Sequence, residues 1–232
     1  MKDSHQNEFL KRTKIFSSLN DKEMEQIINK LLVKQFNKNE TILHEEDTNE
    51  FMYLILLGKV KVVRTTEDGK EIILAVHQSG EFFGEMSMID GKTTPASVIT
   101  TENSLVAIIS KTDFYSILFT QNKVVTNLLK IFCSRLRKCW DTIQLLNFNN
   151  AAQRTKMLFL MLADEYGRKT ENGVTLNIKL THQDIADMAG LTRETVTRVI
   201  DKLQRNKEIT ILENKYIHLS PDFLQKDLNI KI

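Results

Sequence analysis

The feature of this sequence that most constrains its fold is one long stretch with regular apolar spacing, residues 123–148 (KVVTNLLKIFCSRLRKCWDTIQLLNF). Its apolar side chains recur at alternating steps of four and three residues: Val125, Leu129, Phe132, Leu136, Cys139, Ile143 and Leu146. That spacing places all seven on one narrow stripe of an α-helix, as in the seam of a coiled coil. The stripe packs either on the core of its own domain or on the same helix of a second copy. Three uninterrupted heptads favour a parallel homodimer.

The whole chain is long enough for two domains, because its 232 residues exceed the length of an ordinary single domain. A hydrophobic content of 41% with 27% charged residues is typical of a globular chain. The longest apolar run, Phe51–Leu57, is too short to cross a membrane, and the first residues lack the apolar core of a signal peptide. The cysteines, Cys133 and Cys139, point in different directions on one helix and predict no disulfide. We therefore expect a cytoplasmic protein with no membrane partner.

Before the long helix, residues 40–110 have the period of β-strands. Apolar side chains alternate with polar ones in residues 59–62 and again in residues 72–76. Asp68-Gly69 supplies the positive φ that a two-residue hairpin loop requires, and further glycines punctuate the segment. The pattern predicts an antiparallel β-roll, preceded by a short helix whose capping box begins at Asn20.

After the long helix, residues 181–205 predict a helix-turn-helix. Thr181-His182-Gln183-Asp184 has the form of a capping box, and Gly190 allows a left-handed turn. Thr192 then caps a second helix with long polar side chains at its N-terminal end, where base edges would be met. Residues 191–207 contain five basic and two acidic side chains, which favours an anionic partner. A purely structural helical hairpin is the alternative. Residues 210–219 predict a closing wing. We expect residues 167–173 to form a polar loop and the tail after Pro221 to be peripheral.

The candidate contacts to double-stranded DNA lie mostly in the N-terminal halves of these two helices, and Lys202 lies near the end of the second. They are Thr181, His182, Gln183, Thr192, Arg193, Glu194, Thr195, Thr197, Arg198 and Lys202.

Taken together, the motifs resemble the bacterial cyclic-AMP receptor protein/fumarate-nitrate regulator (Crp/Fnr) family of transcription regulators. The resemblance covers residues 15–219 and is carried by GEFFGEMSMIDG at 80–91, the long helix, and LTHQDIADMAGLTRETVTRVI at 180–200. It implies an α+β protein with an effector-sensing β-roll (1–121), a long central dimerisation helix (122–148) and a winged helix-turn-helix (149–232). It also implies a homodimer that binds a palindromic site, contacts RNA polymerase and catalyses no reaction.

The resemblance is specific at the base-reading positions. In the cyclic-AMP receptor branch, an Arg-Glu pair and an Arg four residues after the Glu read a TGTGA-type half-site, and Arg193, Glu194 and Arg198 match. The chemistry agrees, because Arg donates two hydrogen bonds to guanine O6 and N7, and Glu accepts one from cytosine N4.

The effector pocket departs from the family pattern. Family members that bind cyclic AMP follow the Gly-Glu of the phosphate cassette with an Arg-Ser pair, and their long helix supplies Thr-Ser to the purine. The positions that make up the candidate pocket are Gly84, Glu85, Met86, Lys92, Thr94, Pro95, Cys139 and Trp140. Thr94-Pro95 replaces Arg-Ser, Cys139-Trp140 replaces Thr-Ser, and Lys92 is displaced by two residues.

We therefore expect that cyclic AMP is not the effector, since a buried cyclic phosphate needs a paired cation. Two alternatives stay open. One is a less charged, partly aromatic ligand. The other is a pocket filled by Trp140, with DNA binding independent of small molecules. In either case we interpret the remaining Gly84-Glu85 of the cassette as a structural turn.

Other cofactors and functions find less support in the sequence. The β-roll contains no cysteine for an iron–sulfur cluster, and His77 is the only conceivable haem ligand. A cupin-like metal enzyme needs several converging His and Glu ligands, whereas residues 40–110 offer only His44 and His77. A scaffold that acts through protein partners alone gives no reason for the Arg193, Glu194 and Arg198 constellation. We expect no metal or cofactor. Cys139 is either a buried, inert thiol or a redox-sensitive bridge across the dimer.

Overall fold

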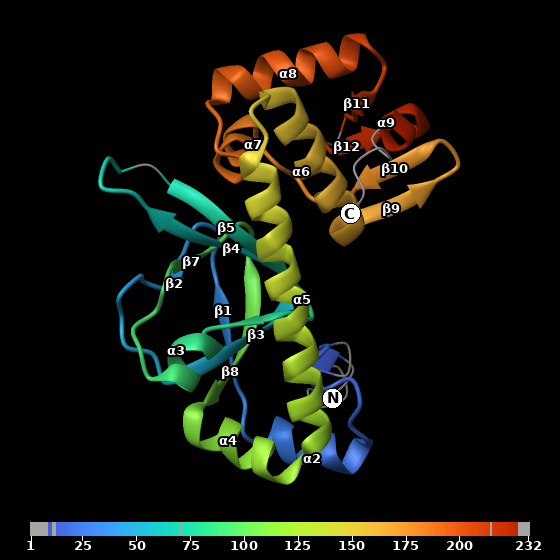
Figure 1. The fold of residues 1–232 in the computed structure, drawn as a ribbon. Helices are drawn as coiled ribbons and strands as arrows, with labels where there is room; N and C mark the ends of the chain where they lie inside the picture. The colour runs from blue at the N-terminus through green and yellow to red at the C-terminus, as the bar shows by residue number, and fades with distance from the viewer. Residues whose placement is uncertain (1–8, 11–12, 70, 214, 227–232) are drawn as a thin grey trace. The chain divides into compact units, whose positions relative to one another are not determined.

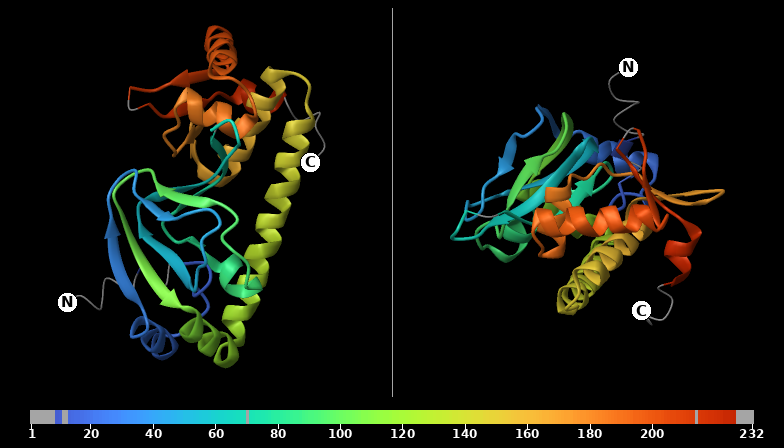
Figure 2. Two further views of the ribbon diagram at one scale, coloured as in Figure 1. Left: turned by 90° about the vertical axis from the view of Figure 1, so that its left-hand side faces the viewer. Right: turned by 90° about the horizontal axis from the view of Figure 1, so that it is seen from above.

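The computed structural model describes residues 9–10, 13–69, 71–213 and 215–226 (Figures 1 and 2). The chain divides into two compact units, Met1–Leu136 and Arg137–Ile232. The boundary between them falls inside one continuous helix, α5 (Asn122–Asn147). The finer division into three parts at residues 121 and 148 stays a prediction.

The first unit is built on two antiparallel sheets. The strands are β1 (Leu32–Phe36), β2 (Thr41–Leu43), β3 (Phe51–Leu57), β4 (Lys59–Thr65), β5 (Glu71–Gln78), β6 (Phe82–Phe83), β7 (Ser97–Thr100) and β8 (Ser104–Ser110). One sheet has the order β1-β8-β3-β6 and the other β2-β7-β4-β5. The helices are α2 (Asp21–Ile28), α3 (Glu85–Asp90), α4 (Lys111–Thr120) and the first part of α5. This confirms the predicted antiparallel β-roll (Figure 1).

The central position of β3 explains its unbroken apolar run. Tyr53 and Ile55 belong to a core between the two sheets, which also contains Val60 and Val98 of the second sheet. The intervening residues of β3 point the other way, into a second core. That core joins β3 and β8 to α2, α4 and α5 through Met52, Leu54, Leu56, Ile109, Met24, Ile27, Phe114, Val124 and Leu128. Because successive side chains of a strand alternate between its faces, a strand covered on both sides must be apolar throughout.

Two local predictions of the β-roll have different outcomes. Asn20 caps α2 in a complete capping box with Glu23, as expected. The hairpin between β4 and β5 forms where Asp68-Gly69 predicts it, with Thr65 paired to Glu71. The expected two-residue length of its loop stays a prediction, because residue 70 lies outside the described residues. Gly69 has the positive φ of 77°, and its N–H donates to the Thr66 carbonyl at 2.8 Å.

The second unit is a winged helix-turn-helix, which confirms the predicted class. After the end of α5 come α6 (Ala151–Tyr166), β9 (Gly167–Thr170), β10 (Gly173–Leu176), α7 (His182–Ala189), α8 (Arg193–Arg205), β11 (Ile209–Ile211), β12 (Ile217–Leu219) and α9 (Pro221–Lys226). The strands form one antiparallel sheet in the order β11-β12-β10-β9. Asn150 caps α6 through the Ala152 N–H.

Two segments of this unit differ from expectation. Residues 167–173, expected as a polar loop, contribute strand β9 to a hairpin with β10, because Thr170 and Gly173 are paired across the turn. The segment after Pro221, expected to be peripheral, begins with a helix whose Phe223 is fully buried. The ring centroids of Phe223 and Phe159 are 6.3 Å apart. All four residues of β9 are exposed, so no apolar alternation marks it as a strand in the sequence. The buried Phe223 ring holds the short helix α9 on the core.

Candidate nucleic-acid interface and effector site

The second helix of the motif, α8, has one buried face and one exposed face at its N-terminal end. Val196, Ile200 and Leu203 are buried. Arg193 and Arg198 are exposed, as is Glu194 between them. These three residues and Thr197 line one open hollow on the surface. The sequence therefore brings the predicted base-reading side chains together in one place, because residues three and four apart share a helix face.

Both helices of the motif begin at a side-chain cap. Thr181 and Asp184 form a capping box at α7, with the Asp184 N–H donating to the Thr181 hydroxyl at 3.1 Å. Thr192 caps α8 by accepting from the Thr195 N–H at 3.3 Å. Gly190 ends α7 with a φ of 62°, the left-handed conformation that the sequence predicts for the turn. These caps determine where each helix starts and hence which side chains lie at its exposed end.

The remaining predicted DNA contacts divide into two groups. Thr181, Gln183, Thr192 and Lys202 are exposed, whereas His182, Thr195 and Thr197 are half-buried. His182 Nδ1 lies 2.8 Å from the Thr197 hydroxyl, which joins the first turn of α7 to α8. The Gln183 amide donates to the Asp187 carboxylate at 2.7 Å.

One residue of this unit escaped sequence reasoning. Arg154, in the first turn of α6, donates from Nε to the Phe148 carbonyl at 2.6 Å and from Nη1 to the Gly190 carbonyl at 3.3 Å. It thereby joins the residue after α5 to the turn of the helix-turn-helix. Both carbonyls lie just beyond helix C-termini, where a cation is stabilised by the helix dipole. No local sequence pattern identifies such a contact, because Gly190 is 36 residues away along the chain.

In the first unit, Gly84 is required by the backbone. It adopts a φ of 81° before α3, and a Cβ at this position would lie 2.8 Å from the Tyr53 ring. The buried Asn49 amide donates to the Gly84 carbonyl at 2.8 Å, and the Tyr53 ring stacks on Phe83 with centroids 5.0 Å apart. Burial raises the pKa of Tyr53. This environment is that of a packed structural turn.

Glu85 follows this glycine, is almost completely buried, and is bound by a residue of α5. The Arg135 guanidinium donates from Nη1 to Glu85 Oε1 at 2.6 Å and from Nη2 to the Phe82 carbonyl. It also lies over the Phe82 ring, 4.5 Å from the centroid. No local sequence pattern identifies this contact, because Arg135 and Glu85 are 50 residues apart along the chain.

The polar groups of Thr94 also form hydrogen bonds within the first unit. Its side chain is buried, and its hydroxyl bonds to the His44 carbonyl and lies 3.1 Å from the Asp47 carbonyl. Its backbone N–H donates to the same Asp47 carbonyl at 2.8 Å. Thr94 therefore holds the loop between β2 and β3.

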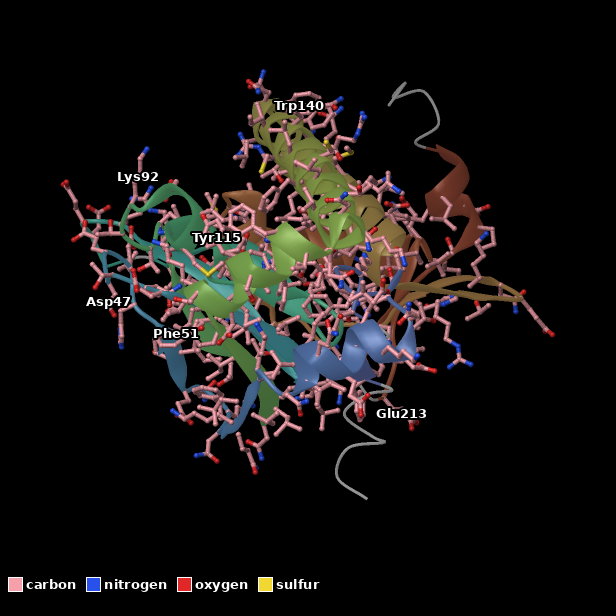
Figure 3. All side chains as sticks on the ribbon, turned by 90° about the horizontal axis from the view of Figure 1, so that it is seen from below. Asp47, Phe51, Lys92, Tyr115, Trp140 and Glu213 are labelled. Carbon is pink, nitrogen blue, oxygen red and sulfur yellow. The ribbon has the colours of Figure 1, made fainter. Side chains whose placement is uncertain are left out.

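The other candidate pocket residues are exposed. In the first unit these are Met86, Lys92 and Pro95, and the Lys92 side chain extends outward from the loop after α3 (Figure 3). Cys139 and Trp140 belong to the second unit, and both are exposed on α5. The burial of Cys139 in a dimer seam therefore stays a prediction.

Helix α5 carries an exposed apolar stripe whose membership differs partly from the predicted seam. Leu129, Leu136 and Ile143 are between 52% and 59% exposed, and Leu146 is 44% exposed. Phe132, in contrast, packs partly on the core of its own unit. Val125 is half-buried as well, and Trp140 is 57% exposed.

Within the described residues, no group of three or more His, Cys, Asp or Glu side chains is arranged to hold a metal ion. Neither cysteine is in a disulfide. In the same part of the chain, no helix is long and apolar enough to cross a membrane.

Comparisons with known proteins cover both units. A cyclic nucleotide-binding domain model matches residues 33–121, and a Crp-like helix-turn-helix domain model matches residues 153–226. The global nitrogen regulator of a Nostoc species is 30% identical over 188 residues, which cover 79% of this chain and 83% of that protein. The cyclic AMP receptor protein of Thermus thermophilus is 28% identical over 194 residues, covering 84% and 87% respectively. The solved structure of a CooA mutant from Carboxydothermus hydrogenoformans superposes with a TM-score of 0.76 at 19% identity and covers 89% of each chain.

Proposed function

Because the chain belongs to the Crp/Fnr family of DNA-binding transcription regulators, which are not enzymes, we propose that it reads a TGTGA-like palindrome as a homodimer. The observation that carries the proposal is the exposed face of α8. Arg193, Glu194 and Arg198 are exposed together at its N-terminal end, where recognition helices meet base edges. Arg193 and Arg198 donate to guanine, and Glu194 accepts from cytosine N4.

The dimer is supported by the exposed stripe of α5. The helix buries Val124 and Leu128 on one side. The opposite side of a helix with this period carries Leu129, Cys133, Leu136, Trp140 and Ile143, again at steps of four and three. A second copy of the same helix covers such a stripe best, because a parallel coiled coil pairs each seam residue with its own mate. The proposed seam thus keeps three predicted residues and has Cys133 and Trp140 in place of Phe132 and Cys139.

The effector is not cyclic AMP. The guanidinium beside the phosphate cassette is that of Arg135, and it is paired with Glu85. Thr94, which occupies the position of the usual phosphate-binding Arg, holds a loop instead. The described residues of this unit offer no uncommitted buried cation to neutralise a cyclic phosphate, so burying that phosphate would carry a high cost. These contacts favour DNA binding that does not depend on a cyclic nucleotide.

The protein acts in the cytoplasm and contacts RNA polymerase when bound to its site. Both statements rest on the family, whose members regulate transcription.

A direct binding measurement tests the function. The probe is a duplex with two inverted TGTGA half-sites whose centres lie about 34 Å apart, and the comparison is the same duplex with scrambled half-sites. Without any added nucleotide, we expect the full-length protein to bind the palindrome about a thousandfold or more tightly than the scrambled duplex. Equal affinity for the two duplexes contradicts the proposal.

A further inference from the structure

One side chain joins the end of α5 to the turn of the helix-turn-helix motif. Arg154, in the first turn of α6, is half-buried. Its Nε donates to the Phe148 carbonyl at 2.6 Å, and its Nη1 donates to the Gly190 carbonyl at 3.3 Å. Phe148 directly follows the last residue of α5, and Gly190 ends α7. A single guanidinium therefore connects the end of α5 with the turn that leads into α8.

Packing between the same two segments supports this bridge. A Cβ on Gly190 would lie 3.1 Å from Leu146 Cδ2, so the last turn of α5 lies directly against the turn of the motif. The neighbouring side chain of α5, Leu145, is buried. The end of α5 is therefore held by apolar contact as well as by hydrogen bonds, and both act at the turn that precedes α8.

A second contact joins α5 to the other end of α6. The Lys138 ammonium donates to the carboxylate of Glu165, in the last turn of α6. Arg154 and Glu165 lie at opposite ends of α6, so the final turns of α5 are tied to this helix at two points. Without the Arg154 bridge, the motif could pivot about the remaining contact.

The angle between α5 and α8 matters because of what each helix carries. The exposed stripe of α5 is the proposed dimer seam, and the start of α8 carries the proposed base-reading residues. In a dimer of helix-turn-helix units, the separation of the two recognition helices has to match the distance between half-site centres, about 34 Å. A pivot between α5 and α8 would change this separation and let the dimer accept more than one half-site spacing.

We propose that Arg154 is the positioning residue that determines which half-site spacing the dimer accepts. The inference deepens the proposed function and rests on it. Arg193, Glu194 and Arg198 read the sequence of one half-site, whereas Arg154 acts through α8 and sets the distance between the two half-sites. Arginine suits this task because its rigid fork of donors reaches two carbonyls at once.

The test compares three duplexes with the same two inverted TGTGA half-sites and the full-length protein. One is the palindrome described above, and the other two have a spacer one base pair longer or shorter, which moves a half-site by about 3.4 Å and rotates it by about 34°. We expect the wild-type protein to prefer the palindrome about tenfold or more, because either altered spacer requires the complex to deform. Arg154→Met removes both hydrogen bonds and should reduce this preference to within about threefold.

Gln153→Met is the matched control, because Gln153 is the exposed neighbour of Arg154, and it should keep the wild-type spacing preference. Arg154→Lys keeps the charge but not the fork, so we expect an intermediate preference, and this variant decides the question if Arg154→Met does not fold.

A purely structural role of Arg154 would weaken binding to the three duplexes by the same factor. An unchanged spacing preference in the Arg154 variants therefore overturns the inference, as does an equal loss of preference in Gln153→Met or a wild-type protein that binds all three spacings equally. Failure of the wild-type protein to distinguish the palindrome from the scrambled duplex is a different result, which contradicts the proposed function instead.

Discussion

At the scale of single residues, arginine side chains that look alike in the sequence have different surroundings in the structure. Arg193 and Arg198 are exposed at the recognition surface, Arg154 bonds to two backbone carbonyls, and Arg135 neutralises a buried carboxylate. The guanidinium suits all three tasks because its donors form a rigid fork and its charge is permanent. Only the surroundings distinguish an Arg that reads DNA from one that holds the fold.

The base-reading role predicts a loss of selectivity. Arg193→Ala and Arg198→Ala should each cost about 1–3 kcal/mol per half-site and relax the preference at one base pair. Lys202→Ala is the control on the same helix, and as a phosphate contact it should weaken binding of all sequences alike. Competition with duplexes substituted at single base pairs measures both effects. An equal loss on palindromic and scrambled DNA for Arg193→Ala contradicts base reading.

The Arg135–Glu85 pair predicts an asymmetric effect on stability. The Glu85 side chain is 3% exposed, whereas that of Arg135 is 25% exposed. Arg135→Met therefore leaves a buried carboxylate without its cation, and we expect it to cost about 3–5 kcal/mol of unfolding free energy. Glu85→Gln should cost less, because the Arg135 guanidinium still reaches solvent and the Phe82 carbonyl.

Urea denaturation measures both variants, with the exposed Arg137→Met as the control on the same helix. Equal stability of Arg135→Met and Arg137→Met would show that the ion pair contributes nothing to the first unit.

At the scale of elements, α5 has the apolar pattern of two functions at once. Its buried side completes the core of the first unit through Val124 and Leu128, and the opposite side carries an exposed apolar stripe, which we propose as the dimer seam. The seven predicted seam residues share the exposed positions Leu129, Leu136 and Ile143 with the stripe. The helix positions on the two sides of these three residues are both partly apolar. The apolar period alone therefore does not show which side belongs to the seam.

The stripe predicts that a charge in its middle abolishes the dimer. Leu136→Glu places facing carboxylates in an apolar interface, which costs several kcal/mol. We expect a monomer in light scattering and a loss of operator binding, because one half-site provides little affinity. Gln144→Glu, on the exposed polar surface of the same helix, should remain dimeric. A dimeric Leu136→Glu protein would show that this stripe is not the interface.

The two cysteines allow the register of the seam to be tested. In the proposed register Cys133 faces its mate, so mild oxidation with diamide joins the two thiols and passes two electrons and two protons to the oxidant. The Cys139→Ser variant, which keeps Cys133, should form a disulfide-linked dimer on non-reducing gels. The Cys133→Ser variant should not. The opposite result restores the register read from the sequence, with Cys139 on the seam.

At the scale of the whole molecule, two units with different cores share one helix, and each unit carries its own candidate site. The relatives that match both units include a nitrogen regulator and a cyclic AMP receptor protein, so the common fold does not specify one effector. The side chains of the first unit, and not its fold, therefore decide which effector can bind.

Those side chains predict that cyclic AMP and cyclic GMP do not regulate this protein. Isothermal titration of the purified protein should show no binding at micromolar concentrations, and neither nucleotide should tighten operator binding. The reason is electrostatic, since Arg135 is committed to Glu85 and Lys92 is exposed. Micromolar binding coupled to tighter operator binding would overturn this prediction, and Lys92→Ala would then test Lys92 as the phosphate ligand.

The sequence by itself determined the features that depend on neighbours along the chain. The capping boxes at Asn20 and Thr181, the turn at Gly190 and the apolar face of α8 all involve residues within a few positions of each other. Local hydrogen bonds and the period of a helix or strand decide such features, so their pattern is visible in the letters. The family resemblance adds the order of the two units.

Only the tertiary structure decided which distant groups meet. Glu85 and Arg135 are 50 residues apart, Thr94 and His44 are also 50 apart, and His182 reaches Thr197 across a turn. The same holds for Phe223, whose burial against Phe159 turned an expected peripheral tail into part of the core. A polar side chain in a sequence carries no sign of its partner, because that partner is chosen by how the sheets and helices pack. The same packing decides which flank of α5 is covered and which is exposed.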